Sequence, residues 1–355
     1  MAVSSKPPAN RFVAVARKVY NPIGFTHGYN FIFFFIFGVA MTVFCLYSMP
    51  SMNVDGNFCG PNGGGAPGEC FHYREGLDRI GMILHLVGIL PAGILAVIQF
   101  VPAIRHKFLI LHRINGYLVL LLSAIGAAGG FIISRHAFGG GLDTQFASGT
   151  LFVLFCTSLI ISYINIKRLQ LEQHRAWMLR AWFYGGAIIT TRLIMNAAAS
   201  IITNSGGYHV ARSCAWLDFT IEDTERMLEL YPLCSAWATG ESPGQMVVVV
   251  AQMGGTSAAE AAAALSVPFG AASWLALALH AIGVEIYLHL TPGEAERLRK
   301  ASYQRQLAAG MRHPGRAGLT SDRLGDAEIW TPKDAEQGST GITTPPQEMT
   351  TAMKD

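Results

Sequence analysis

Charge is scarce in this sequence. Only 14% of its 355 residues are charged, whereas 51% are hydrophobic. Soluble domains carry about 25% charged residues, so this deficit excludes an ordinary soluble protein. Basic residues form no long run and the net charge is only +3, so nucleic acid is not expected as a partner. The sequence also lacks an Asn-x-Ser/Thr acceptor, and N-glycosylation is therefore not predicted.

Long apolar runs are abundant instead. Each is close to the roughly 20 residues that a helix needs to cross hydrocarbon, and each is too uniformly apolar for a barrel strand. The runs predict an all-α, polytopic membrane helix bundle with six transmembrane helices, and so a multi-pass integral membrane protein in contact with lipid. They cover residues 30–49, 80–102, 114–134, 146–166, 181–203 and 266–290.

The distribution of basic residues predicts the orientation. Most Lys and Arg fall before residue 30, in the second and fourth loops, and after residue 290. Because basic residues collect on the cytoplasmic side, we expect both termini in the cytoplasm. Residues 1–29 are then a cytoplasmic segment, 30–203 hold the first five helices, 204–265 form an external loop domain, and 291–355 form a disordered cytoplasmic tail poor in large apolar groups. We expect the first apolar run to be a signal anchor without a cleavage site.

Cysteine positions agree with this topology, because none falls in a segment assigned to the cytoplasm. Disulfides persist only in oxidising compartments. We expect a bridge between Cys59 and Cys70, which close a glycine-rich turn, and a second between Cys214 and Cys234; the alternative is free thiols. In the external loop domain, residues 246–251 indicate a strand or an interfacial segment.

Polar side chains inside the predicted spans are costly in hydrocarbon and are therefore functional candidates. The fifth span contains Arg192, whose guanidinium needs an anion, carbonyl groups or water. The sixth contains His280 and the second contains His85. The alternative is that such groups only form hydrogen bonds between helices and fix their packing.

Two cytoplasmic helix starts carry the same dipeptide. His112-Arg113 opens the third span and His174-Arg175 opens the fifth. The free N–H groups at a helix start favour anions, so these pairs are candidates for holding a phosphate, a carboxylate or a lipid headgroup. Simple positive-inside anchoring is the alternative.

These motifs also carry a resemblance over roughly residues 80–200. The sequence resembles a microbial family of predicted multipass membrane proteins known as domain of unknown function 2306, which implies a helix bundle and no generally established activity. The residues that carry the resemblance are His85, Gln99-Phe100, Arg105, His112-Arg113, Gly116-Tyr117, His174-Arg175, Trp177-Met178, Arg180 and Thr191-Arg192.

The first functional hypothesis is a transmembrane redox protein that binds haem b, an oxidoreductase whose axial ligands are histidines from different helices. Depth in the membrane allows an outer pair of His85 with His136 or His280, and an inner pair of His112 with His174. The outline is similar to di-haem membrane cytochromes, but fold alone does not give function.

The second hypothesis is a non-haem membrane enzyme acting on a lipid or anionic metabolite at the cytoplasmic interface. His112 and His174 are then the catalytic candidates for general acid and base. Arg113, Arg175 and Arg192 hold the anionic group. A transporter is a further alternative, although no inverted repeat is present. We expect no separate metal site, and the sequence leaves the small-molecule ligand and the enzymatic activity open.

Overall fold

The structure, a computed structural model, describes residues 7–60 and 65–332. These residues form two compact units. The first consists of the described residues up to Leu159 together with Leu179–Ile286, and the second of Ile160–Met178 together with the described residues from Tyr287 onward.

Six helices in the described residues are long and apolar enough to cross a membrane, as expected. The spans are formed by helices α2 (Gly28–Ser48), α3 (Gly76–Phe100), α5 (Leu109–Ile133), α6 (Leu142–Lys167), α7 (Leu171–Ser205) and α12 (Phe269–His289). A short turn extends the first span to Met52, and another extends the third span to His136. The sixth span begins with helix α11 (Ala258–Ser266). Many of their outward side chains, such as Leu121, Val153 and Leu279, are exposed, as expected of helices that contact lipid. The protein is a multi-pass integral membrane protein, and the cytoplasmic position of its termini stays a prediction.

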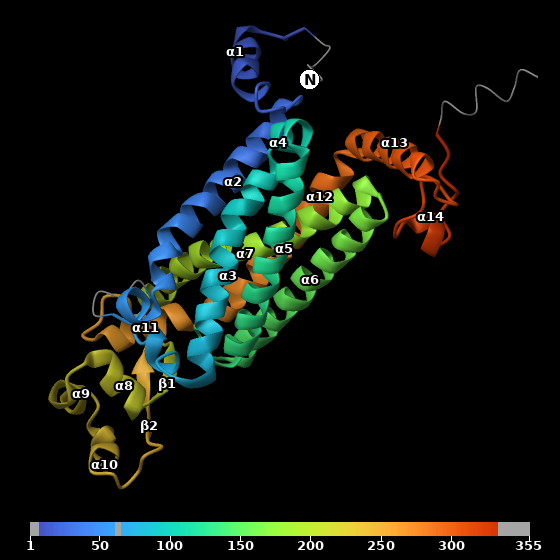
Figure 1. The fold of residues 1–355 in the computed structure, drawn as a ribbon. Helices are drawn as coiled ribbons and strands as arrows, with labels where there is room; N and C mark the ends of the chain where they lie inside the picture. Colours follow the sequence, from blue (N-terminus) through green and yellow to red (C-terminus); the bar gives the residue numbers. More distant parts are fainter. Residues whose placement is uncertain (1–6, 61–64, 333–355) are drawn as a thin grey trace, which may run out of the picture. The chain divides into compact units, whose positions relative to one another are not determined.

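In the first unit, α2, α3 and α5 run side by side (Figure 1). α3 and α5 approach closely because glycines face each other, and a methyl group added at Gly88 would lie 2.6 Å from the Cα of Gly126. α6 packs on α5 through Phe131 and Phe152, and on α7 through Phe155 and Trp182. Short helices α1 (Arg11–Tyr20) and α4 (Pro102–Lys107) precede α2 and α5 respectively.

The segment between α7 and α12 packs around a hydrophobic core of its own. Strands β1 (His209–Ser213) and β2 (Met246–Val250) pair antiparallel, with Ala211 opposite Val248. Residues 246–250 are therefore a strand rather than an interfacial segment. Helices α8 (Cys214–Ile221), α9 (Thr224–Leu230), α10 (Ser235–Ala238) and α11 complete the domain. Its core includes Leu217, Met227 and Val249, all fully buried.

Both expected disulfides are confirmed. Cys59 and Cys70 are bridged with Cα atoms 5.3 Å apart, and Cys214 and Cys234 with Cα atoms 5.6 Å apart. Short helical turns at Met49–Met52, Val54–Phe58 and Glu69–His72 flank the first bridge, and others lie at Ser134–His136 and Pro232–Cys234.

The second unit differs from the expected disordered tail. Residues Pro292–Ala308 form helix α13 and Ser321–Leu324 form α14. Buried polar groups hold this segment to the junction between α6 and α7, where Gln170, Ser302 and Gln306 are fully buried. Composition suggested disorder because the segment has few large apolar groups, but amide and hydroxyl hydrogen bonds order it as far as residue 332. The prediction for residues 333–355 lies outside the described residues.

Candidate functional site

The seam between α7 and α12 contains a buried imidazole with both ring nitrogens bonded. His280 of α12 is 9% exposed. Its Nδ1 lies 2.7 Å from the carbonyl oxygen of Phe183, and its Nε2 lies 2.8 Å from the hydroxyl oxygen of Thr190. A carbonyl oxygen can only accept, so in the neutral imidazole Nδ1 carries the proton and Nε2 accepts a hydrogen bond from the Thr190 hydroxyl. This is the arrangement of a hydroxyl group and a base oriented by a third group.

The local sequence explains this geometry. Phe183 and Thr190 are seven residues apart, so they lie on the same face of α7. Between them, Gly186 has no side chain, and a Cβ added there would lie 3.6 Å from Cε1 of His280. The imidazole therefore lies near the backbone of α7 at Gly186, at a distance that would still accommodate a methyl group.

Apolar groups cover the imidazole from a third helix. The ring of Phe37 in α2 lies 6.2 Å from the His280 ring and 5.0 Å from the Phe183 ring, measured between centroids. Met41 of α2 also approaches Gly186. These neighbours limit the access of water, and water exclusion strengthens hydrogen bonds at a buried polar site.

A charged pair lies on the same two helices. Arg180 of α7 binds Glu285 of α12 in a bidentate manner, through contacts of 2.6 Å from Nε and 2.9 Å from Nη2. The side chains are 19% and 42% exposed, respectively. Bidentate pairing fixes geometry as well as charge, so this pair sets the register of α12 against α7.

The seam between α3 and α5 uses its polar residues differently. His85 Nδ1 lies 2.8 Å from the carbonyl oxygen of Gly126, Gln99 donates to the carbonyl oxygen of His112 at 2.8 Å, and Asn115 donates to that of Leu95 at 3.0 Å. Each of these side chains bonds a main-chain oxygen of the facing helix. The arrangement ties two closely packed helices together.

In the second unit, His174 follows the same rule. Its Nδ1 lies 3.1 Å from the carbonyl oxygen of Ser162 and 2.8 Å from the Ser162 hydroxyl. Its neighbour Arg175 lies over the ring of Tyr287 at 5.6 Å and reaches the hydroxyl of Thr291 at 3.5 Å. These contacts hold α7 to α6 and to the segment after α12.

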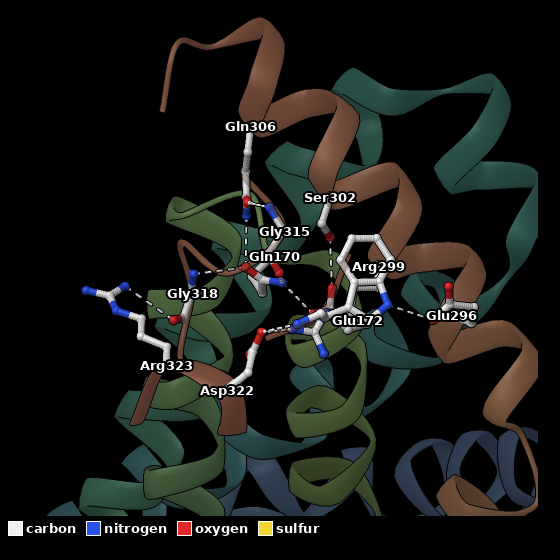
Figure 2. Close-up of polar contacts among 11 residues, drawn as sticks. Gln170, Glu172, Glu296, Arg299, Ser302, Gln306, Gly315, Gly318, Asp322 and Arg323 are labelled. Atoms are coloured by element: carbon white, nitrogen blue, oxygen red, sulfur yellow. Dashed lines mark hydrogen bonds and ion pairs between the residues drawn. The ribbon is translucent and has the colours of Figure 1, made fainter. Parts of the chain in front are cut away.

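A second polar cluster in this unit surrounds Gln170 (Figure 2). The side-chain oxygen of Gln170 accepts from Gln306 and from the backbone of Gly318, and its amide donates to the carbonyl of Gly315, each at 2.9 Å. Figure 2 shows Glu172 between Gln170 and Ser302, and it accepts hydrogen bonds from both. The network consists of saturated amide, hydroxyl and carboxylate contacts, so we interpret it as structural.

Asp322 extends the network. Arg299 donates to Asp322 at 2.7 Å, and the backbone nitrogen of Trp330 donates to it at 3.1 Å. Burial acts to raise the pKa of Asp322, but the nearby polar groups of Thr320, Trp330 and Arg299 together outweigh it and lower that pKa.

Each of the expected outer haem ligands forms hydrogen bonds with other groups. His85 bonds Gly126, His280 bonds Thr190 and Phe183, and His136 bonds Asp78 at 2.9 Å. The described residues contain no cluster of three His, Cys, Asp or Glu side chains able to hold a metal ion. The binding of haem b, including an inner pair of His112 with His174, stays a prediction that no described contact supports.

The expected anion partners are described one by one. Arg113 is exposed on α5, and Arg192 lies 5.7 Å from the ring of Phe269. Arg175 and His174 belong to the second unit, whereas Arg113 and His112 belong to the first. The two His-Arg pairs therefore stay separate candidates rather than one observed site.

Sequence reasoning missed Thr190, which completes the contact with His280. The spacing of seven residues between Phe183 and Thr190, with Gly186 between them, was the available signal. It was hidden because threonine is common in membrane helices, where it usually bonds its own backbone. Thr191, its neighbour, does this by donating to Ala187.

Comparisons with known proteins agree with the membrane assignment. The model of a family described as "Predicted membrane protein (DUF2306)" matches residues 82–221. The chain is also similar to "Ava biosynthesis cluster protein G" of Aspergillus versicolor, with 27% identity over 231 residues, covering 55% of this chain and 65% of that protein. The chain thus spans less than two thirds of this relative. No solved structure matches it. Residues 82–221 therefore match the model of the same family of predicted membrane proteins that the paired His-Arg motifs resemble.

Proposed function

We propose that this multi-pass membrane protein is an enzyme that moves a proton on an apolar small molecule, with His280 as the base and Thr190 as the hydroxyl that relays the proton. The observation that carries the proposal is the contact of Nε2 of His280 with the Thr190 hydroxyl at 2.8 Å, while Nδ1 is held by the carbonyl of Phe183. The fixed tautomer directs the lone pair of Nε2 at the hydroxyl.

Every proton that leaves the substrate returns to it through Thr190 and His280. A substrate C–H made acidic by a neighbouring carbonyl gives its proton to Oγ1 of Thr190 as the Thr190 proton moves to Nε2 of His280. The imidazolium then returns a proton through Thr190 to another atom of the same substrate. The net reaction is an isomerisation that needs no external oxidant or reductant. General acid–base catalysis of this kind contributes about 100- to 10,000-fold to a rate.

The surroundings favour an apolar substrate. Phe37, Phe183 and Met41 approach the imidazole, and the helices that carry them lie in spans suited to hydrocarbon. The similarity to a protein named for a biosynthesis cluster supports a role in small-molecule biosynthesis. The two other hypotheses, an interfacial enzyme using His112 and His174 and a transporter, stay predictions.

Deuterium incorporation tests the proposal. Membranes containing the protein are incubated in D2O with a lipid-soluble extract of the source organism, and products are analysed by mass spectrometry. We expect a mass-shifted or isomerised metabolite that the His280→Asn membranes form at least about 100-fold more slowly.

A matched control lies on the same helix. Ser273 of α12 donates its hydroxyl to its own helix at Phe269, so Ser273→Ala removes a polar group without touching the seam. We expect this variant to match the wild type. Equal exchange by wild-type and folded His280→Asn membranes would reject His280 as the base.

A further inference from the structure

A second group of imidazoles lies at the ends of two membrane spans, beside the first disulfide. The rings of His72 and His136 are stacked, with centroids 4.4 Å apart and planes 8° from parallel. Asp78 contacts His136 Nδ1 at 2.9 Å, and Tyr73 donates its hydroxyl to the carbonyl of His136 at the same distance. The bridge from Cys70 to Cys59 anchors the short helical turn that carries His72.

Two guanidinium groups add positive charge here without a carboxylate partner among the described residues. Arg74 lies between the rings of Phe71 and Phe219, at 5.0 and 4.7 Å. Arg212 lies 4.9 Å from the ring of Trp216 and donates to Ser266 at 2.8 Å, while its Nε is buried without a hydrogen-bond partner. An unpaired buried donor of a charged group is costly unless a ligand satisfies it.

The nearby carboxylates are already engaged. Asp78 is held by His136, and Glu69 accepts a hydrogen bond from the backbone of Ala66 at 2.9 Å. The net charge of this group of side chains is therefore positive. Arg74 also donates from Nε to the carbonyl oxygen of Phe71 at 3.2 Å. Aromatic stacking keeps each guanidinium in a fixed orientation, and a stacked guanidinium is suited to recognising oxyanions.

We propose that His72, Arg212 and Arg74 form a binding site for an oxyanion, either a carboxylate or a phosphate group of a small molecule. This site is distinct from the α7–α12 seam and does not depend on the proposed function. His136 and Asp78 act as positioning residues, because they fix the plane on which the His72 ring is stacked.

The electrostatics of His72 fit such a ligand. Burial lowers the pKa of His72, and the charges of His136, Arg212 and Arg74 lower it further, while Asp78 opposes them. A bound oxyanion stabilises the protonated imidazole and raises this pKa, so binding takes up a proton. Affinity should increase as the pH falls toward the ordinary titration range of histidine.

Calorimetric titration of the full-length protein in detergent tests the site, with inorganic phosphate and acetate as probes at constant ionic strength. We expect saturable binding of at least one probe, weakened at least tenfold in Arg212→Gln and in His72→Gln. Binding of phosphate alone identifies a phosphoryl ligand, and binding of acetate identifies a carboxylate; either result supports the proposal.

Arg135→Gln is the matched control, because Arg135 adjoins His136 in sequence but its side chain is exposed. It should bind as the wild type does. His72→Gln also guards against loss of fold in the arginine variant, since the glutamine keeps a polar side chain on a surface turn. The proposal is overturned if neither probe binds, or if both site variants bind as tightly as Arg135→Gln.

Discussion

The α3–α5 seam and the α7–α12 seam are each tied by a histidine whose Nδ1 bonds a main-chain carbonyl oxygen. At α3–α5, His85 bonds Gly126 at 2.8 Å, and a Cβ added at Gly130 would lie 2.9 Å from the same nitrogen. At α7–α12, His280 bonds Phe183 at 2.7 Å, and its other nitrogen meets the hydroxyl of Thr190. The same tautomer is thus fixed twice, but only the second imidazole faces a hydroxyl group it can activate.

This difference separates packing from chemistry. Glycines bring the backbones of α3 and α5 together, and the polar side chains satisfy carbonyl oxygens across the contact. α7 and α12 are held by a charged pair and by the imidazole, so the polar groups face one another rather than the backbone alone. Four predictions test this distinction, in order of decreasing effect.

The largest effect is expected where glycine forms the contact. Gly88→Leu places a side chain against the Cα of Gly126. Because backbone atoms cannot move aside as a flexible side chain can, the variant should lose more than about 3 kcal/mol of stability. Size-exclusion chromatography and thermal melting measure this. Gly149→Leu in α6, where a Cβ meets nothing within 4 Å, is the control and should change stability by no more than about 0.5 kcal/mol. Comparable melting of both variants would contradict close packing at Gly88.

The second prediction exchanges the two histidines for asparagine, whose amide N–H can still donate to the carbonyl oxygen. His85→Asn and His280→Asn should both stay folded. Only His280→Asn should lose deuterium exchange, by at least about 100-fold, because asparagine has no base to accept the Thr190 proton. Loss of exchange in His85→Asn at normal yield would break the comparison, since the α3–α5 seam would then also carry chemistry.

The third prediction concerns the charged pair of the α7–α12 seam. Arg180→Gln and Glu285→Gln each leave one charge half-buried without its partner, so each should cost about 1–3 kcal/mol. The double variant should cost less than the sum, with a coupling of about 1 kcal/mol, because no lone charge remains. Thermal melting of the wild type, the two single variants and the double variant provides the double-mutant cycle. If the stability losses of the two single variants simply added up in the double variant, the pair would not join the two helices.

The smallest effect on stability is expected in the second unit, in the hydrogen-bond network around Gln170, where amide groups take the place of an imidazole. The pKa of Asp322 is lowered on folding, so its ionised form adds stability above the ordinary carboxyl range, and this stability is lost as the pH falls through the lowered value. Fluorine NMR of 5-fluorotryptophan at Trp330 should report loosening on acidification. Asp322→Asn should remove this pH dependence, and an identical transition in that variant would assign it to another group.

Much of the fold could be predicted from local sequence. Uninterrupted apolar length gives the six spans, because hydrocarbon requires all backbone groups to be paired within a helix. The two bridges also followed, since each cysteine pair lies within a single loop. The segment after residue 290 was different: its order comes from Gln170 and Glu172, more than a hundred residues earlier in the chain, and composition carries no sign of that contact.

The candidate site divides in the same way. His280 could be singled out from the sequence because an imidazole in an apolar run is costly. Its partner could not be chosen, since any of several hydroxyl or carbonyl groups in the other spans has suitable chemistry. The same holds for His72 and Arg212, which lie 140 positions apart and were not considered together.

The sequence by itself determined that the chain crosses a membrane and which segments do so, because both follow from the solvation and length of continuous apolar runs. Only the tertiary structure decided which nitrogen of His280 meets Thr190, and which groups gather around His72. Hydrogen bonds extend about 3 Å and depend on angle, so they are fixed by how helices distant in sequence are rotated against one another.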